Sequence, residues 1–190
     1  LPPFIGGAAG FFGYDLVRGI ERLPPRAPAH GPDLCIGLYD KVLAFDHKSG
    51  TAQFMIWAVN EDAAIVQKTY LERLVAQNAP VSPDSMPLEW AAKRNDQQFQ
   101  SDIARVIEYI YAGDIFQANL SRRYSAQIPS GFNPYAHYLH LRDINPAPFA
   151  AYMNFDGTIL SSCSPERFLE VKKRIVETRP IKGTLPSSQP

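Results

Sequence analysis

A glutamate and a lysine near the end of the sequence could carry out acid and nucleophilic chemistry. Glu166 lies in the segment Ser-Pro-Glu-Arg-Phe (164–168), directly before a strand-like run, and Lys182 lies in Pro-Ile-Lys-Gly-Thr (180–184), directly after one. A hairpin between them would bring Lys182 back beside Glu166. A lysine attacks carbon only as the free amine, and a glutamate donates a proton only when protonated, so both roles require a dry setting. The alternative is a solvated surface pair worth about 0–1 kcal/mol.

Three neighbours of Lys182 favour the chemical interpretation. Gly183 allows close approach of a ligand to the backbone, and Thr184 adds a hydroxyl group, so both are predicted to bind substrate. A cationic neighbour such as Arg179 would favour the free amine of Lys182.

Two hairpins are predicted to position these residues. Runs at Phe149 to Phe155 and Thr158 to Ser162 flank Asp156-Gly157, a strong hairpin turn signal. Two more strands are expected over 167–172 and 174–179.

The rest of the chain alternates between strand and helix signals. Strands in hairpins with interspersed helices indicate an α+β fold dominated by antiparallel sheet. The predicted elements are a glycine-rich strand and helix at 4–21, a hairpin of 34–45 with 51–59, a helix capped by Asn60 that ends near Asn78, a helix carrying Phe99 to Ile110 that ends before Gly113, a strand-like run at 115–128 and a short helix at 134–143. The proline-containing loop at 80–87 could separate two subdomains.

Composition disfavours several classes of protein. The 19 basic and 19 acidic residues cancel, which makes nucleic acid a poor partner. No apolar run approaches the roughly 18 residues of a membrane span. The two cysteines, Cys35 and Cys163, are expected to be reduced thiols of a cytoplasmic protein. His137 and His140 have a spacing that can bind metal, but without a carboxylate or cysteine partner they favour an ordinary structural role.

Five segments, in chain order, resemble the chorismate-utilising enzymes, a family that includes anthranilate synthase component I and aminodeoxychorismate synthase component I. They are Gly7 to Glu21, Gly-Asp-Ile-Phe-Gln-Ala-Asn-Leu-Ser (113–121), Asn-Pro-Ala-Pro-Phe (145–149), Ser-Pro-Glu-Arg-Phe (164–168) and Thr-Arg-Pro-Ile-Lys-Gly-Thr (178–184). The resemblance implies an anthranilate synthase component I-like fold with helices packed outside antiparallel sheets, of which this chain is an N-terminal and central fragment.

Lys182 distinguishes between two groups of enzymes within that family. Anthranilate synthases generally carry alanine at this position, so Lys182 resembles the aminodeoxychorismate synthases of 4-aminobenzoate and folate biosynthesis. The resemblance implies that Lys182 attacks C2 of chorismate, that Glu166 protonates the departing C4 hydroxyl, and that ammonia then adds at C4.

The resemblance also implies partners that the residues alone do not reveal. A glutamine amidotransferase subunit would supply ammonia, and Mg²⁺ would hold chorismate through glutamates in a C-terminal half absent from this sequence. No metal site is therefore expected in this fragment, and the fragment alone is expected to be inactive. Pro148, Phe149 and Ala150 correspond to a segment that helps hold tryptophan, although an ordinary strand start explains them equally well. Ser187 stands where relatives often place arginine, which leaves anion steering at that loop open.

Two rival functions remain at this point. One is anthranilate synthase component I, which directs the amine to C2; a lysine nucleophile occupying C2 argues against it. The other is a non-catalytic module that binds tryptophan or the glutaminase. The presence of both Glu166 and Lys182 argues against decay of the site.

Overall fold

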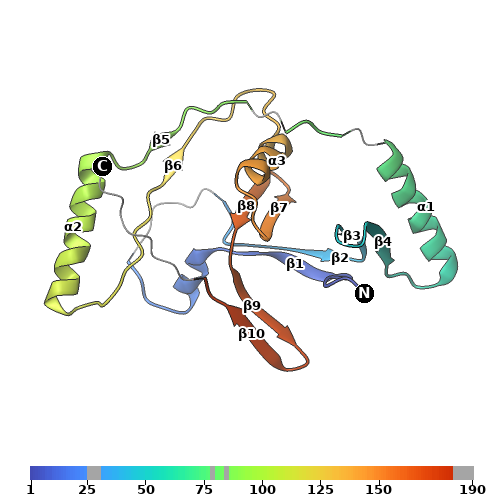
Figure 1. Ribbon diagram of the computed structural model, residues 1–190, viewed down its shortest axis with the longest axis horizontal. Helices are drawn as coiled ribbons and strands as arrows, with labels where there is room; N and C mark the ends of the chain where they lie inside the picture. Colours follow the sequence, from blue (N-terminus) through green and yellow to red (C-terminus); the bar gives the residue numbers. More distant parts are fainter. Residues whose placement is uncertain (25–30, 78–79, 84–85, 182–190) are drawn as a thin grey trace. The chain divides into compact units, whose positions relative to one another are not determined.

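The computed structural model describes residues 1–24, 31–77, 80–83 and 86–181. The chain divides into two units, Leu1–Ser82 with Leu141–Pro190, and Pro83–His140. In chain order the elements (Figure 1) are β1 (Gly7–Phe12), a 3₁₀ helix (Tyr14–Gly19), β2 (Leu34–Tyr39), β3 (Lys41–Asp46), β4 (Thr51–Ile56), α1 (Glu61–Gln77), β5 (Ala91–Ala92), α2 (Asp96–Ala112), β6 (Tyr124–Ser125), α3 (Pro134–Ile144), β7 (Phe149–Phe155), β8 (Thr158–Ser164), β9 (Arg167–Lys172) and β10 (Ile175–Arg179).

The strands of the described chain pair antiparallel, in sheets of two. This confirms the predicted α+β class with antiparallel sheet. The predicted strand over 34–45 is wrong in one respect, because it divides into β2 and β3. The first half pairs with β1, with Phe11 opposite Cys35, whereas the second half pairs with β4.

The glycine-rich start forms the closely approached strand that its sequence predicted. Gly10 lies opposite Ile36, and a Cβ at Gly10 would clash with the carbonyl oxygen of Cys35. Only glycine can occupy such a position without displacing the neighbouring backbone. The helix expected after β1 is present as a 3₁₀ helix.

Each of the three α-helices begins at a capping asparagine, of which Asn60 was predicted from the sequence. The Asn60 side chain accepts a hydrogen bond from the Ala63 amide at 2.9 Å at the start of α1. Asn95 and Gln98 form a reciprocal capping box at the start of α2, and Gly113 ends that helix with φ 82°. Asn133 caps α3 through the amide of Tyr135 at 3.0 Å.

The strand-like run at 115–128 is the clearest wrong prediction. Within the described residues, only Tyr124 and Ser125 join a sheet there, opposite the two-residue strand β5. A pattern of apolar residues does not form a strand without a partner, because the backbone hydrogen bonds of a sheet join neighbouring strands. Phe116 is accordingly 92% exposed.

The hairpins around Glu166 match their predicted positions. β7 pairs with β8 across Asp156 (φ 36°) and Gly157 (φ 89°), and β9 pairs with β10 across Lys173 (φ 48°) and Arg174 (φ 68°). Two consecutive positive φ angles are the geometry of a type I′ turn, which matches the twist of the flanking strands. As Figure 1 shows, β8 leads directly into β9, so the two hairpins meet at residues 165 and 166.

Few side chains are buried in the described part of the chain. The buried residues there are Ala136 and Tyr138, both on α3, and many large apolar side chains are exposed. None of the described helices is long and apolar enough to cross a membrane.

Candidate active site

Glu166 lies at the junction between β8 and β9. Its side chain is half-buried, and its carbonyl oxygen accepts a hydrogen bond from the Ser164 hydroxyl at 3.2 Å. This bond closes a short turn over Pro165, so the last residue of β8 helps fix the direction in which Glu166 leaves the strand. The predicted acid is therefore held between two hairpins rather than on a free loop.

An open cavity lies beside Glu166. It has a volume of ≈ 240 Å³ and is lined by Glu166, Arg167, Phe168 and Thr178. Thr178 reaches it from β10, and its hydroxyl donates to the Phe168 carbonyl oxygen at 3.0 Å. The cavity is thus formed where the start of β9 and the end of β10 meet.

The register of the β9–β10 hairpin returns the chain to Glu166. Arg179, the last residue of β10, pairs with Arg167, the residue after Glu166. The returning chain predicted from the sequence is therefore present as far as Ile181. Lys182, Gly183 and Thr184, the other predicted site residues, lie outside the described residues, as does Ser187.

The segment Pro148, Phe149 and Ala150 begins β7 on the strand beside Glu166. Phe149 pairs with Ser164, two residues before the predicted acid. The amide of Ala150 donates to the carbonyl oxygen of Ala147 at 3.2 Å, which forms a turn at the strand start. The structure therefore places this segment and Glu166 at the same end of one hairpin.

A charged network surrounds Arg167, and the sequence analysis did not single it out. The Arg167 guanidinium contacts the carboxylates of Glu170 on β9 and Glu177 on β10, the second at 3.1 Å. Lys172 also pairs with Glu170, and the Nε atom of Arg179 contacts Glu177 at 2.8 Å. A detectable signal was the grouping of opposite charges on two predicted strands that must pair.

The network lowers the pKa of Glu170. The main cause is the hydrogen bond from Lys172; desolvation opposes it, and the positive charges of Arg167 and Lys172 reinforce it. Glu170 therefore acts as a counter-ion for the two basic side chains that it contacts.

The described residues do not form a magnesium site. No group of three or more His, Cys, Asp or Glu side chains among them is arranged to hold a metal ion. Carboxylate oxygens are the protein ligands that Mg²⁺ prefers, and the glutamates near Glu166 are engaged by basic side chains. The set present here does not fit that ion.

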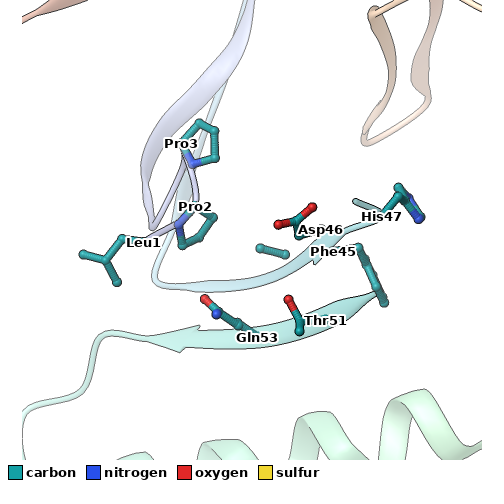
Figure 2. Close-up of a pocket in the computed structure, with 9 residues that line it drawn as sticks. Leu1, Pro2, Pro3, Phe45, Asp46, His47, Thr51 and Gln53 are labelled. Atoms are coloured by element: carbon teal, nitrogen blue, oxygen red, sulfur yellow. The ribbon is translucent and has the colours of Figure 1, made fainter. Parts of the chain in front are cut away.

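Another cavity in the same unit has no predicted site residue. Figure 2 shows it between Leu1, Pro2 and Pro3 on one side and the β3–β4 hairpin on the other, and its volume is ≈ 400 Å³. Its acid, Asp46, already accepts hydrogen bonds from the amides of Lys48 and Ser49 at 2.9 and 3.3 Å. Asp46 therefore stabilises its own turn, and the candidate active site remains the cavity at Glu166.

Comparison with known proteins identifies the class. The family model described as chorismate binding enzyme matches residues 2–190. The chain belongs to this family of chorismate-binding enzymes.

Relatives from two branches match the chain about equally well. Aminodeoxychorismate synthase component 1 of Klebsiella aerogenes is 35% identical over 187 residues, which cover 97% of this chain and 40% of that protein. Anthranilate synthase component 1 of Thermus thermophilus is 37% identical over 197 residues, which cover 98% of this chain and 41% of that protein. The chain thus spans about 40% of the length of these relatives, and overall identity does not choose between the branches.

A solved structure shares the fold. Anthranilate synthase component I from Streptococcus pneumoniae matches with a TM-score of 0.82 and 28% identity, over 92% of this chain and 42% of that chain. The predicted anthranilate synthase component I-like fold is confirmed by this match.

Proposed function

We propose that the chain is part of an aminodeoxychorismate synthase component I, which converts chorismate and ammonia to 4-amino-4-deoxychorismate. The observation that carries the proposal is a lysine in Pro-Ile-Lys-Gly-Thr (180–184) that follows β10, whose last residue pairs with Arg167, the neighbour of Glu166. The resemblance associates lysine at this position with the aminodeoxychorismate branch and alanine with the anthranilate branch.

The short segment between Arg179 and Lys182 is compatible with Lys182 and Glu166 acting on one substrate. Lys182 follows Arg179 by three residues, and three residues span at most about 10 Å. Arg179 lies opposite Arg167. An extended lysine side chain adds several ångströms of reach, so a substrate ring held between Lys182 and Glu166 is compatible with the described strands.

The proposed reaction has two steps. The free amine of Lys182 forms a bond to C2 of chorismate, the ring double bonds shift, and the C4 hydroxyl leaves as water with the proton of Glu166. Ammonia then bonds to C4, the double bonds shift back, and the lysine amine leaves C2. The product carries nitrogen at C4, and both side chains return to their starting forms once the carboxylate of Glu166 regains a proton.

The remaining components are proposed to lie outside this chain. A glutamine amidotransferase would supply ammonia, and the Mg²⁺ ligands are proposed to come from another part of the protein, as the resemblance implies. Gly183 and Thr184 are proposed to contact the substrate, and Pro148, Phe149 and Ala150 to line a tryptophan site.

The test is turnover by the full-length gene product with chorismate, ammonium and Mg²⁺, with products separated by chromatography and identified by mass. We expect 4-amino-4-deoxychorismate, its loss in Lys182→Ala, and a decrease of about 10²–10⁴-fold in Glu166→Gln, the usual contribution of a general acid. Lys68→Ala, on the exposed face of α1, is the matched control and should keep full activity.

The similar identity to anthranilate synthases makes their reaction the second candidate. Anthranilate as the product, unaffected by Lys182→Ala, would place the protein in that branch. No consumption of chorismate, together with binding of tryptophan, would instead favour a regulatory module.

A further inference from the structure

We propose that Arg167 is a positioning residue that orients Glu166 for proton transfer. This inference rests on the proposed function, because it concerns the acid assigned there. Arg167 follows Glu166 directly, so the two residues share a peptide bond, and whatever fixes one guanidinium restricts the backbone from which the glutamate side chain extends.

The guanidinium joins three strands. Its Nη1 atom contacts Glu170 on β9 and Glu177 on β10, and its central carbon lies 5.5 Å from the centre of the Phe149 ring on β7. Phe149 is paired with Ser164, whose hydroxyl holds the Glu166 carbonyl oxygen. Glu166 is therefore restrained from β8 by a hydrogen bond and from β7, β9 and β10 through its neighbour.

Arg167 is the least exposed of the three basic side chains in this network. Its side chain is 26% exposed, whereas those of Lys172 and Arg179 are each 69% exposed. An ion pair gains strength as water is excluded, while a fully exposed pair contributes little. Arg167 is accordingly the member whose contacts can hold the junction, and the two others pair with the same glutamates from more exposed positions.

The chemistry of arginine suits this role. Its planar fork presents several N–H groups in fixed directions and also stacks on aromatic rings, whereas lysine offers a single flexible ammonium. Glu170 and Glu177 neutralise the guanidinium, so Arg167 restrains the junction without adding an unpaired positive charge next to the acid. A shift of a reacting group by about 1 Å can cost about 10²-fold in rate, which sets the expected effect.

The experiment measures kcat and KM for chorismate in the full-length protein. We expect Arg167→Ala to lower kcat about 10²-fold with KM changed less than about twofold, because substrate binding is retained while proton transfer is misaligned. The kcat of Arg167→Lys should lie between those of the parent and of Arg167→Ala, since lysine keeps the positive charge but lacks the planar guanidinium group. Guanidinium ion added at millimolar concentration should restore part of the activity of Arg167→Ala, whereas urea should not.

Two further variants test whether Arg167 acts through its ion pairs with the glutamates. Lys172→Gln removes a cation from the same network and should leave kcat within about twofold of the parent. Glu177→Gln should lower kcat partly, and its effect should not add to that of Arg167→Lys, because residues that share one interaction are coupled.

The outcomes separate the inference from the proposed function. An unchanged kcat in Arg167→Lys together with no rescue of Arg167→Ala overturns the positioning role while the reaction itself stands. A raised KM at constant kcat also overturns it, by assigning Arg167 to substrate binding. Should Arg167→Ala fail to fold, by circular dichroism and thermal unfolding, the Arg167→Lys result decides. A parent protein that makes no 4-amino-4-deoxychorismate refutes the proposed function instead.

Discussion

Glu170 forms ion pairs with two basic side chains of its own strand, β9. Its hydrogen bond with Lys172, helped by the charge of Arg167, holds its pKa below the ordinary value of 4.5. A carboxyl group whose pKa is lower in the folded state binds protons more weakly there than in the unfolded chain. The stabilisation is therefore present above pH 4.5 and is lost as pH falls through the lowered folded pKa.

Glu170→Gln should remove this acid-sensitive stabilisation. The difference in unfolding free energy between the parent and the variant, measured by urea unfolding of the full-length protein, should shrink as pH falls from 6 to below the lowered pKa. Glu72→Gln is the control, because that carboxylate contacts Lys68 on an exposed helix at 3.6 Å. A difference for Glu170→Gln that stays constant over this pH range would contradict the assignment.

The two hairpins that meet at Glu166 differ in how well their turns suit their geometry. Both turns have consecutive positive φ angles. Asp156-Gly157 has the composition that this geometry favours, whereas Lys173-Arg174 places two bulky residues in the left-handed region. The β9–β10 turn is thus strained, and an ion pair between Arg167 on β9 and Glu177 on β10 links its two strands.

Replacing the strained turn by Asn-Gly should stabilise the protein. Lys173→Asn with Arg174→Gly is expected to raise the free energy of unfolding by about 1 kcal/mol, since the strain removed exceeds the added flexibility of the unfolded chain. The midpoint of denaturant unfolding measures it. Gly157→Ala, at the other turn, should shift the midpoint in the opposite direction; equal shifts in both variants would rule out this explanation.

Local signals predicted those parts of the fold that local interactions determine. The cap at Asn60, the helix end before Gly113 and the turn at Asp156 gave correct boundaries, because each signal acts within a few residues. The run at 115–128 failed because a strand needs a partner elsewhere in the chain. Glu166 was proposed as the acid from its type and position, whereas the network of Arg167 depends on the register of β9 against β10, which periodicity does not supply.

Across the described part of the chain, large apolar side chains remain exposed on most elements. Phe168 is 85% exposed, Leu38 86% and Tyr111 88%, and the buried residues among those described are confined to α3. The chain also spans about 40% of the length of its relatives. Apolar surface on this scale destabilises an isolated protein in water, because burial is the main source of folding energy.

The 190-residue chain produced by itself is therefore expected to bind a hydrophobic dye such as ANS strongly and to leave chorismate unconsumed. The full-length gene product, at the same concentration, should bind less dye per residue and should be active. Turnover of chorismate by the purified 190-residue chain would contradict this expectation.

The pairing of Phe149 with Ser164 fixes how far apart β7 and β8 place the residues of the candidate site. The distance from Phe149 to Glu166 is set across the ladder, so the number of residues in the turn at Asp156 has no direct influence on it. A single residue inserted within β8 would act differently: it would advance the register by one step of about 3.3 Å and exchange the two faces of the strand. Insertions or deletions in the turn at Asp156 are therefore compatible with the geometry of the site. Insertions or deletions within β7 or β8 are not.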